Sequence, residues 1–169
     1  MKKMIKPTKI MFEDELTSQI IDKKAFKTEI AKKYTTFLAQ YPDIFSDLIF
    51  GSNFDFALYH SVETYDKESP VDIFNVLRNG NGIEIKPGKA VDSDLELALS
   101  INAVKKLIQT ETKMEYAQLL GTFYDDPDDE KGWIDFVLHK RTQTLIDMGY
   151  GKFAQTAGIL KDDDDIYSI

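Results

Sequence analysis

The chain of 169 residues contains no cysteine, only two histidines and a single tryptophan. The absence of cysteine excludes disulfide bonds, thiol catalysis and thiolate metal ligands. No stretch approaches the roughly 18 uncharged apolar residues that a membrane-spanning helix needs, so integral membrane association is not expected. The sequence opens with Met1 and two lysines, as a signal peptide does, but no apolar stretch of about 7–15 residues follows. We therefore expect a cytoplasmic protein.

Hydrophobic residues make up 43% of the chain, and they include 11 phenylalanines and 8 tyrosines. This composition is sufficient for a packed core, and a chain of this length buries roughly 70% of its surface on folding. No linker or repeat divides the sequence, so we expect one domain over residues 1–169. Residues 1–15 show no clean hydrophobic period and are expected to form a loose leader. Residues 161–169 contain four consecutive aspartates and are expected to form a mobile acidic tail.

Acidic residues outnumber basic ones by 29 to 21, which gives a net charge of −8. An acidic protein repels the phosphate backbone of nucleic acids, so nucleic acid is not an expected partner. Nine of the lysines lie within residues 1–33. They could contact anionic lipid or an acidic protein, although such lysines more often form the solvated face of a helix.

The first half of the chain predicts helices followed by strands. Apolar residues three and four apart between Phe26 and Tyr41 predict an N-terminal helix, with Asp22 as its N-cap. A short helix is expected over residues 43–50. Alternating apolar residues then predict four strands, at residues 54–59, 71–78, 83–87 and 95–99. The dipeptide Asn79-Gly80 predicts a tight hairpin turn between the second and third strands, because Asn-Gly readily adopts the positive φ angles that such turns need.

The second half predicts helices. Their expected ranges are 101–108, with Ser100 or Asn102 as the cap, 112–124, and a long helix over Gly132–Met148 that buries Trp133. The acidic residues 125–130 are interpreted as a turn and helix start. Together these elements predict an α+β fold: a twisted, largely antiparallel sheet of four to five strands backed by helices, with an N-terminal helix and a long C-terminal helix.

No motif in the sequence demands chemistry. An EF-hand loop opening at Asp126 would need glycine and glutamate at its sixth and twelfth positions, where this chain has Lys131 and Val137. Neither His60 nor His139 has a second histidine at metal-ligand spacing. There is no nucleophile elbow and no glycine-rich phosphate loop. We therefore expect no metal, no cofactor and no catalytic residue.

The order of elements between about residues 54 and 121 resembles the lipid-transfer domain of the sterol carrier protein type 2 family. The matching segments are Val76–Gly82 with its Asn-Gly turn, the Asp-initiated strand Asp94–Ser100, and the helices Ile101–Gln109 and Lys113–Gly121. The resemblance implies an apolar tunnel between sheet and helices that takes a fatty acid, an acyl-CoA, a sterol or a phospholipid. After Gly121 the family continues into a final strand and a short C-terminal helix, where this chain predicts the long helix instead.

Large apolar residues cluster on the strands and helices that the resemblance places around this tunnel. Any one of them is more simply a core residue, but as a group they could wall a cavity. The candidate ligand-binding residues are Leu95, Leu97, Leu99, Val104, Leu107, Ile108, Tyr116, Leu119, Leu120, Phe123, Trp133, Phe136 and Val137.

Three functions are compatible with this sequence. The first is non-catalytic binding or transfer of an apolar small molecule. The second is a protein-interaction or scaffold module, in which Trp133 and Phe136 fill the core and the C-terminal helix forms a homodimer or binds another protein. The third is an enzyme acting on an acyl or steroid substrate, with Tyr116, His139 or Asp135 as the acid or base.

Overall fold

The computed structural model describes residues 26–80 and 82–160 and contains one mixed five-stranded sheet. The order of the strands across the sheet is β3-β2-β1-β4-β5. The strands are β1 (Asn53–Tyr59), β2 (Asp72–Asn79), β3 (Gly82–Pro87), β4 (Leu95–Ser100) and β5 (Ile134–Leu138). The four strands expected from the sequence are all present.

The pairings β1–β2, β2–β3 and β4–β5 are antiparallel, whereas β1 and β4 in the middle of the sheet run parallel. The predicted antiparallel character therefore holds for three of the four pairings. The parallel pair arises because the chain returns from the edge strand β3 to the free side of β1. Such a return needs a crossover connection, which the alternation of apolar residues does not reveal.

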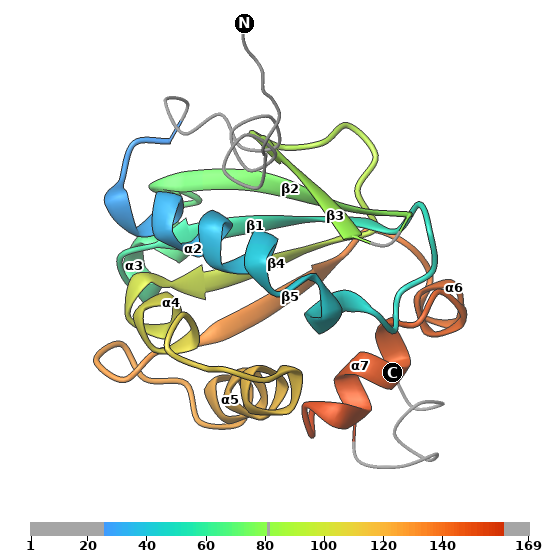
Figure 1. Ribbon diagram of the computed structural model, residues 1–169. Coiled ribbons are helices and arrows are strands. Elements are labelled where there is room, and N and C mark those ends of the chain that lie inside the picture. The colour runs from blue at the N-terminus through green and yellow to red at the C-terminus, as the bar shows by residue number, and fades with distance from the viewer. Residues whose placement is uncertain (1–25, 81, 161–169) are drawn as a thin grey trace, which may run out of the picture.

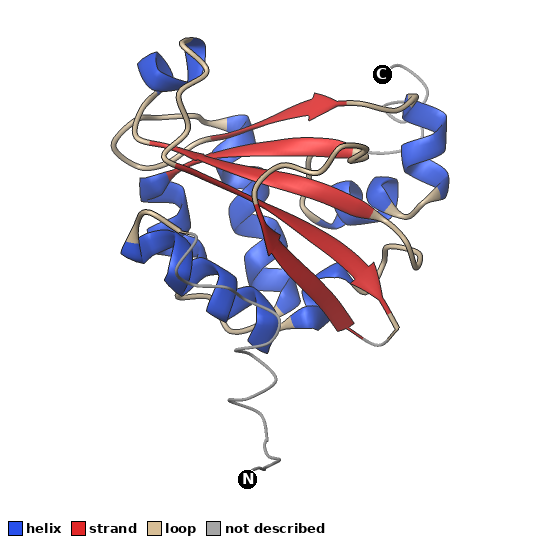
Figure 2. Cartoon of the chain, turned by 90° about the horizontal axis from the view of Figure 1, so that it is seen from above, coloured by secondary structure: helices blue, strands red, loops and turns tan. Residues whose placement is uncertain are grey.

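The helices are mostly short and lie mainly on one side of the sheet (Figures 1 and 2). They are α2 (Glu29–Gln40), the 3₁₀ turn η3 (Pro42–Phe45), α3 (Val62–Asp66), α4 (Ile101–Leu107), α5 (Lys113–Asp125), α6 (Thr142–Asp147) and α7 (Tyr150–Thr156). Within the described ranges, none of these helices has the length and apolar character needed to cross a membrane. The α+β class predicted from the sequence is confirmed.

The predicted N-terminal helix is present as α2 and begins at Glu29. Its N-cap is Thr28, whose hydroxyl accepts a hydrogen bond from the backbone of Ala31. Thr28 in turn donates to the carboxylate of Asp72 from its backbone amide and from its hydroxyl. These bonds attach the start of α2 to β2. The cap predicted at Asp22 lies outside the described residues, as do the predicted leader and acidic tail.

The two faces of the sheet differ in what they contact. Alternate residues of β1 such as Phe56 and Leu58 are fully buried in the main core with the helices. The residues between them point to the other face, where Ala57 and Tyr59 pack with Trp133. The first face carries the helices and the larger part of the core, so a cavity between sheet and helices must lie on that side.

The long helix predicted over Gly132–Met148 is wrong. Residues Ile134–Leu138 form the edge strand β5, which pairs with β4, and only Thr142–Asp147 is helical. Trp133 packs on the opposite face of the sheet, and its indole nitrogen donates to Asp129. The segment was misread because its apolar residues are almost continuous, and such a run does not distinguish a strand from a buried helix.

Two shorter predictions also need correction. The acidic residues 125–130 do not start a helix. Asp125 is the last residue of α5, and in the tight turn that follows it Asp128 accepts hydrogen bonds from the backbones of Glu130 and Lys131. The helix expected over residues 43–50 is reduced to η3. A short helix that the hydrophobic pattern does not predict, α3, lies between β1 and β2 and is capped by Ser61.

Candidate functional site

A cavity of about 530 Å³ lies between the helical face of the sheet and the helices α5, α6 and α7. Its wall is largely apolar and is assembled from segments far apart in the sequence. The lining residues are Phe45, Leu48, Phe54, Phe56, Leu95, Leu97, Tyr116, Leu120, Tyr124, Asp135, Phe136, Leu138, Thr142, Leu145, Ile146, Tyr150, Gly151, Phe153, Ala154, Ile159 and Leu160.

The exposure of the lining residues shows which part of the cavity is deep and which part is open. Phe56 and Tyr116 are fully buried and mark its inner end. Tyr124 and Leu138 are 41% and 45% exposed and border the opening. The entrance therefore lies between the C-terminal end of α5 and the end of β5.

Helical spacing brings the lining side chains of α5 to one face. Tyr116, Leu120 and Tyr124 are four residues apart, so they project from the same side of the helix. The opposing helix α7 approaches α5 closely at Gly121, where an added Cβ atom would lie only 1.7 Å from the carbonyl oxygen of Ala157. Only glycine fits at this position. Because residue 121 has no side chain, α5 and α7 can pack closely enough to close this side of the cavity.

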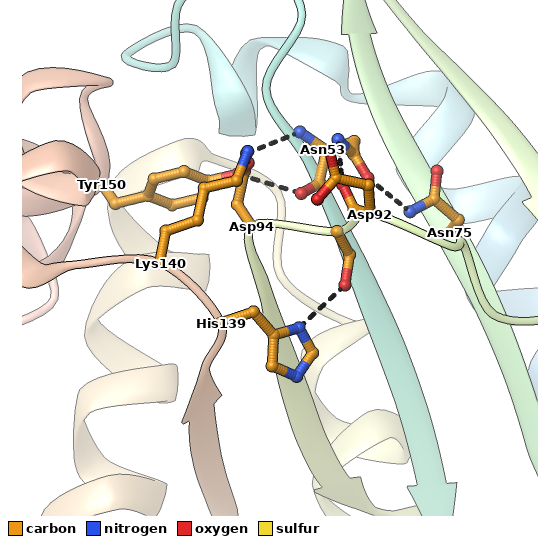
Figure 3. A network of polar contacts seen from close by, with 8 residues as sticks. Asn53, Asn75, Asp92, Asp94, His139, Lys140 and Tyr150 are labelled. Atoms are coloured by element: carbon orange, nitrogen blue, oxygen red, sulfur yellow. Dashed lines mark hydrogen bonds and ion pairs between the residues drawn. The ribbon is translucent and has the colours of Figure 1, made fainter.

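A buried carboxylate, that of Asp94, attaches the α6–α7 side of the cavity to the sheet (Figure 3). One of its oxygens pairs with the Lys140 ammonium at 2.5 Å. The other accepts hydrogen bonds from the backbone amide of Asn53 at 2.9 Å and from the hydroxyl of Tyr150 at 2.7 Å. Asp94 thus contacts β1, the segment after β5, and α7 at once. Because the Tyr150 ring lines the cavity, this network holds part of the cavity wall in place.

The pKa values of Tyr150 and Lys140 are both raised in this network. Burial, together with the hydrogen bond to Asp94, raises the pKa of Tyr150 far above its usual value. The hydrogen bond from Lys140 to Asp94 raises the pKa of that ammonium group. Tyr150 therefore stays neutral and Lys140 stays charged throughout the physiological pH range.

At the inner end of the cavity, two tyrosines are hydrogen bonded to each other. The hydroxyl of Tyr116 on α5 contacts that of Tyr34 on α2, and both side chains are fully buried. Burial raises the pKa of both phenols well above the usual value. A phenol that stays neutral to high pH does not act as a general base near neutrality.

The structure distributes the thirteen candidate residues between the cavity and the rest of the core. Five of them lie in the cavity wall, namely Leu95, Leu97, Tyr116, Leu120 and Phe136. Six pack in the core away from the wall, namely Leu99, Val104, Leu107, Ile108, Leu119 and Phe123. Trp133 packs on the opposite face of the sheet, and Val137 is 41% exposed.

Most of the cavity wall was missed by sequence reasoning, above all the residues of α6 and α7. The apolar residues Tyr150, Phe153 and Ala154 follow one another at steps of three and one, which fits one face of a helix. This spacing indicates a helix, but it does not indicate that the helix borders a cavity. The contributions of η3 and β1, such as Phe45 and Phe54, could be recognised only once the sheet and helices were assembled.

The three side chains considered for catalysis are engaged in separate interactions. The Tyr116 hydroxyl is bonded to Tyr34, and the Asp135 carboxylate accepts a hydrogen bond from the Tyr65 hydroxyl at 2.7 Å. The Nδ1 atom of His139 lies 3.0 Å from the hydroxyl of Ser93, which is buried. In the described part of the chain, no group of three or more histidine, aspartate or glutamate side chains is placed to hold a metal ion.

Comparisons of the chain with protein-family models, with curated proteins and with solved structures found no match.

Proposed function

We propose that this protein binds an apolar small molecule in the cavity between the sheet and the helices α5, α6 and α7, without catalysing its conversion. The observation that carries the proposal is the cavity itself. Its volume of about 530 Å³ falls within the roughly 300–1,000 Å³ typical of small-molecule sites. Its inner end is built from aromatic and aliphatic side chains, and the hydroxyls of Tyr116 and Tyr150 are already engaged with other protein groups.

The hydrophobic effect is sufficient for useful affinity in such a cavity. Burying one methylene group contributes about 0.8 kcal/mol, so about ten methylenes contribute roughly 8 kcal/mol. That free energy corresponds to a dissociation constant of about 1 μM, before the costs of immobilising the ligand are subtracted. An alkyl chain or a sterol-like ring system would therefore bind without any dedicated polar recognition.

The resemblance to the sterol carrier protein type 2 family supports the same proposal. The family continues after its second helix into a final strand and a short helix, and here α5 is followed by β5 and by the short helices α6 and α7. The long helix that set this sequence apart from the family pattern does not form. Within the family the ligand lies between sheet and helices, which is where this cavity lies.

The first experiment is native mass spectrometry of the freshly purified protein, before and after extraction with organic solvent. A retained apolar mass that disappears on extraction would support the proposal and would identify the class of ligand. A protein that carries no such mass and also fails to bind a fluorescent fatty acid or sterol would contradict it.

A cavity-filling substitution tests whether binding takes place in this cavity. Ala154 on α7 lines the cavity, so Ala154→Trp should place an indole in it and weaken binding of the fluorescent probe by at least tenfold. The neighbouring Gln155 is exposed and does not line the cavity, so Gln155→Trp is the matched control and should bind normally. Equal binding by the two variants would show that the probe binds elsewhere.

The scaffold alternative has less support, because residues Ile134–Leu138 form a strand and the long helix predicted over Gly132–Met148 does not form. That alternative required Trp133 to fill the core beside Phe136, together with a long helix as the interaction surface. Trp133 instead packs against Tyr59 and Tyr65 on the other face of the sheet.

A further inference from the structure

The cavity adjoins a second, more open hollow that has a different character. The hollow has a volume of about 510 Å³ and is lined by Leu138, His139, Lys140, Arg141 and Thr144. Leu138 belongs to both walls, and it is one of the two exposed residues at the opening of the apolar cavity. A ligand that leaves the cavity past Leu138 therefore enters a hollow bordered by basic side chains.

The two basic side chains of this hollow, Lys140 and Arg141, differ in whether a carboxylate of the described residues pairs with them. The Lys140 ammonium is paired with the buried carboxylate of Asp94, so its charge is largely neutralised within the protein. Arg141 is exposed, and none of the residues that the structure describes pairs with its guanidinium group. Asp147, an acid on the helix that follows, is bonded to Gln143. Arg141 thus offers a guanidinium group that no carboxylate within residues 26–80 and 82–160 occupies.

From this arrangement we infer that the ligand is an anionic amphiphile: its apolar tail occupies the cavity, and its carboxylate or phosphate head lies in the hollow against Arg141. This inference rests on the proposed function and adds a headgroup site to it. A guanidinium group suits both kinds of head, because its paired N–H donors match the geometry of carboxylates and phosphates. His139, beside it, can donate a further hydrogen bond from its ring.

The overall charge of the protein makes this inference sharply testable. A chain with a net charge of −8 attracts cations and repels anions at long range. A preference for an anionic ligand over a neutral or cationic one of the same length therefore requires a local positive site. Such a preference would therefore arise from the basic side chains of the hollow, because the net charge of the protein acts in the opposite direction.

The test compares dodecanoate, dodecanol and dodecyltrimethylammonium, which share one tail, by displacement of a fluorescent probe from the full-length protein. We expect dodecanoate to bind most tightly and the ammonium compound most weakly. Arg141→Gln should weaken dodecanoate binding about five- to tenfold and leave dodecanol unchanged. Lys105→Gln, at an exposed lysine of α4 away from the cavity, is the matched control and should change neither.

Each outcome separates this inference from the proposed function. If all three compounds bind with similar affinity, or if Arg141→Gln weakens dodecanoate and dodecanol equally, the headgroup site is refuted while the apolar cavity stands. If none of the three compounds displaces the probe and Ala154→Trp has no effect, the proposed function itself is refuted. A selective loss of dodecanoate binding in Arg141→Gln alone supports the inference.

Discussion

Replacement of Asp94 by alanine is the most informative perturbation of this fold. The carboxylate is fully buried and accepts hydrogen bonds from the Asn53 amide and the Tyr150 hydroxyl, besides its ion pair with Lys140. Asp94→Ala leaves the part-buried Asn53 amide without this acceptor and leaves the Tyr150 hydroxyl with only the Asn53 carbonyl oxygen, at 3.5 Å. A donor that loses its acceptor in this way costs about 1–3 kcal/mol. The Lys140 side chain is 32% exposed, so water can solvate its ammonium group in the variant. Loss of the ion pair therefore adds little to the cost in stability. We expect the free energy of unfolding to fall by about 2–4 kcal/mol.

The matched comparison is Tyr150→Phe, which removes a single hydrogen bond to the same carboxylate. It leaves the Asn53 and Lys140 interactions in place, so the expected cost is about 1 kcal/mol. Both variants would be unfolded with urea and followed by circular dichroism, and the midpoints and slopes would be compared with those of the wild type.

Amide hydrogen exchange gives an independent measurement of the same effect. Asp94 holds the segment after β5 and the helix α7 to the sheet, so Asp94→Ala should increase exchange in α6 and α7 more than in α2. The reasoning would be refuted if Asp94→Ala destabilised the protein no more than Tyr150→Phe, or if the exchange of α6 and α7 remained at its wild-type rate.

Two further predictions concern ionisation and backbone geometry. Tyr34, Tyr116 and Tyr150 have raised pKa values in the folded state, whereas unfolded tyrosines ionise near about pH 10. Their contribution to stability is therefore complete below about pH 10 and is lost as the pH rises further; tyrosinate absorbance should appear together with unfolding, and its appearance in the native state would contradict this. Gly149 has a φ of +103°, and an added Cβ would lie 2.0 Å from the carbonyl oxygen of Asp47. Gly149→Ala should therefore cost about 2 kcal/mol or more, measured by thermal unfolding; Gly80→Ala, at an open turn with positive φ, is the control and should cost less.

Local patterns were sufficient to predict most of the fold. Alternation identified β1 to β4, and the Asn79-Gly80 dipeptide located the hairpin, in which Asn79 pairs with Gly82. The strand pattern and the turn each depend on residues that are close in the sequence, so they can be recognised without knowing the fold. The strand β5 depends on a distant partner, because its residues meet β4 only in the folded sheet. Ile134, Phe136 and Leu138 do alternate on the helical side of the sheet, but the apolar residues Trp133 and Val137 between and beside them obscure the period.

The cavity could be predicted only in part, for a related reason. Periodicity shows which face of an element is apolar, but not whether two apolar faces meet or leave space between them. Leu97 and Leu99 illustrate the limit: both point to the helical side of β4, yet only Leu97 borders the cavity. The Asp94 network likewise joins residues from three distant segments, and no spacing in the sequence connects them.

The parallel pairing of β1 with β4 also constrains the order in which the molecule folds. β1 and β2 are close in sequence, whereas the whole β2–β3 hairpin and the loop after it lie between β1 and β4. Closing that longer loop loses more chain entropy, so the hairpin half of the sheet should form early and the β4–β5 half late. The segments α6 and α7, which complete the cavity, follow β5 in the chain and can dock only on the finished sheet. A partly folded chain therefore has no closed cavity, and the proposed ligand would stabilise only the last stage of folding.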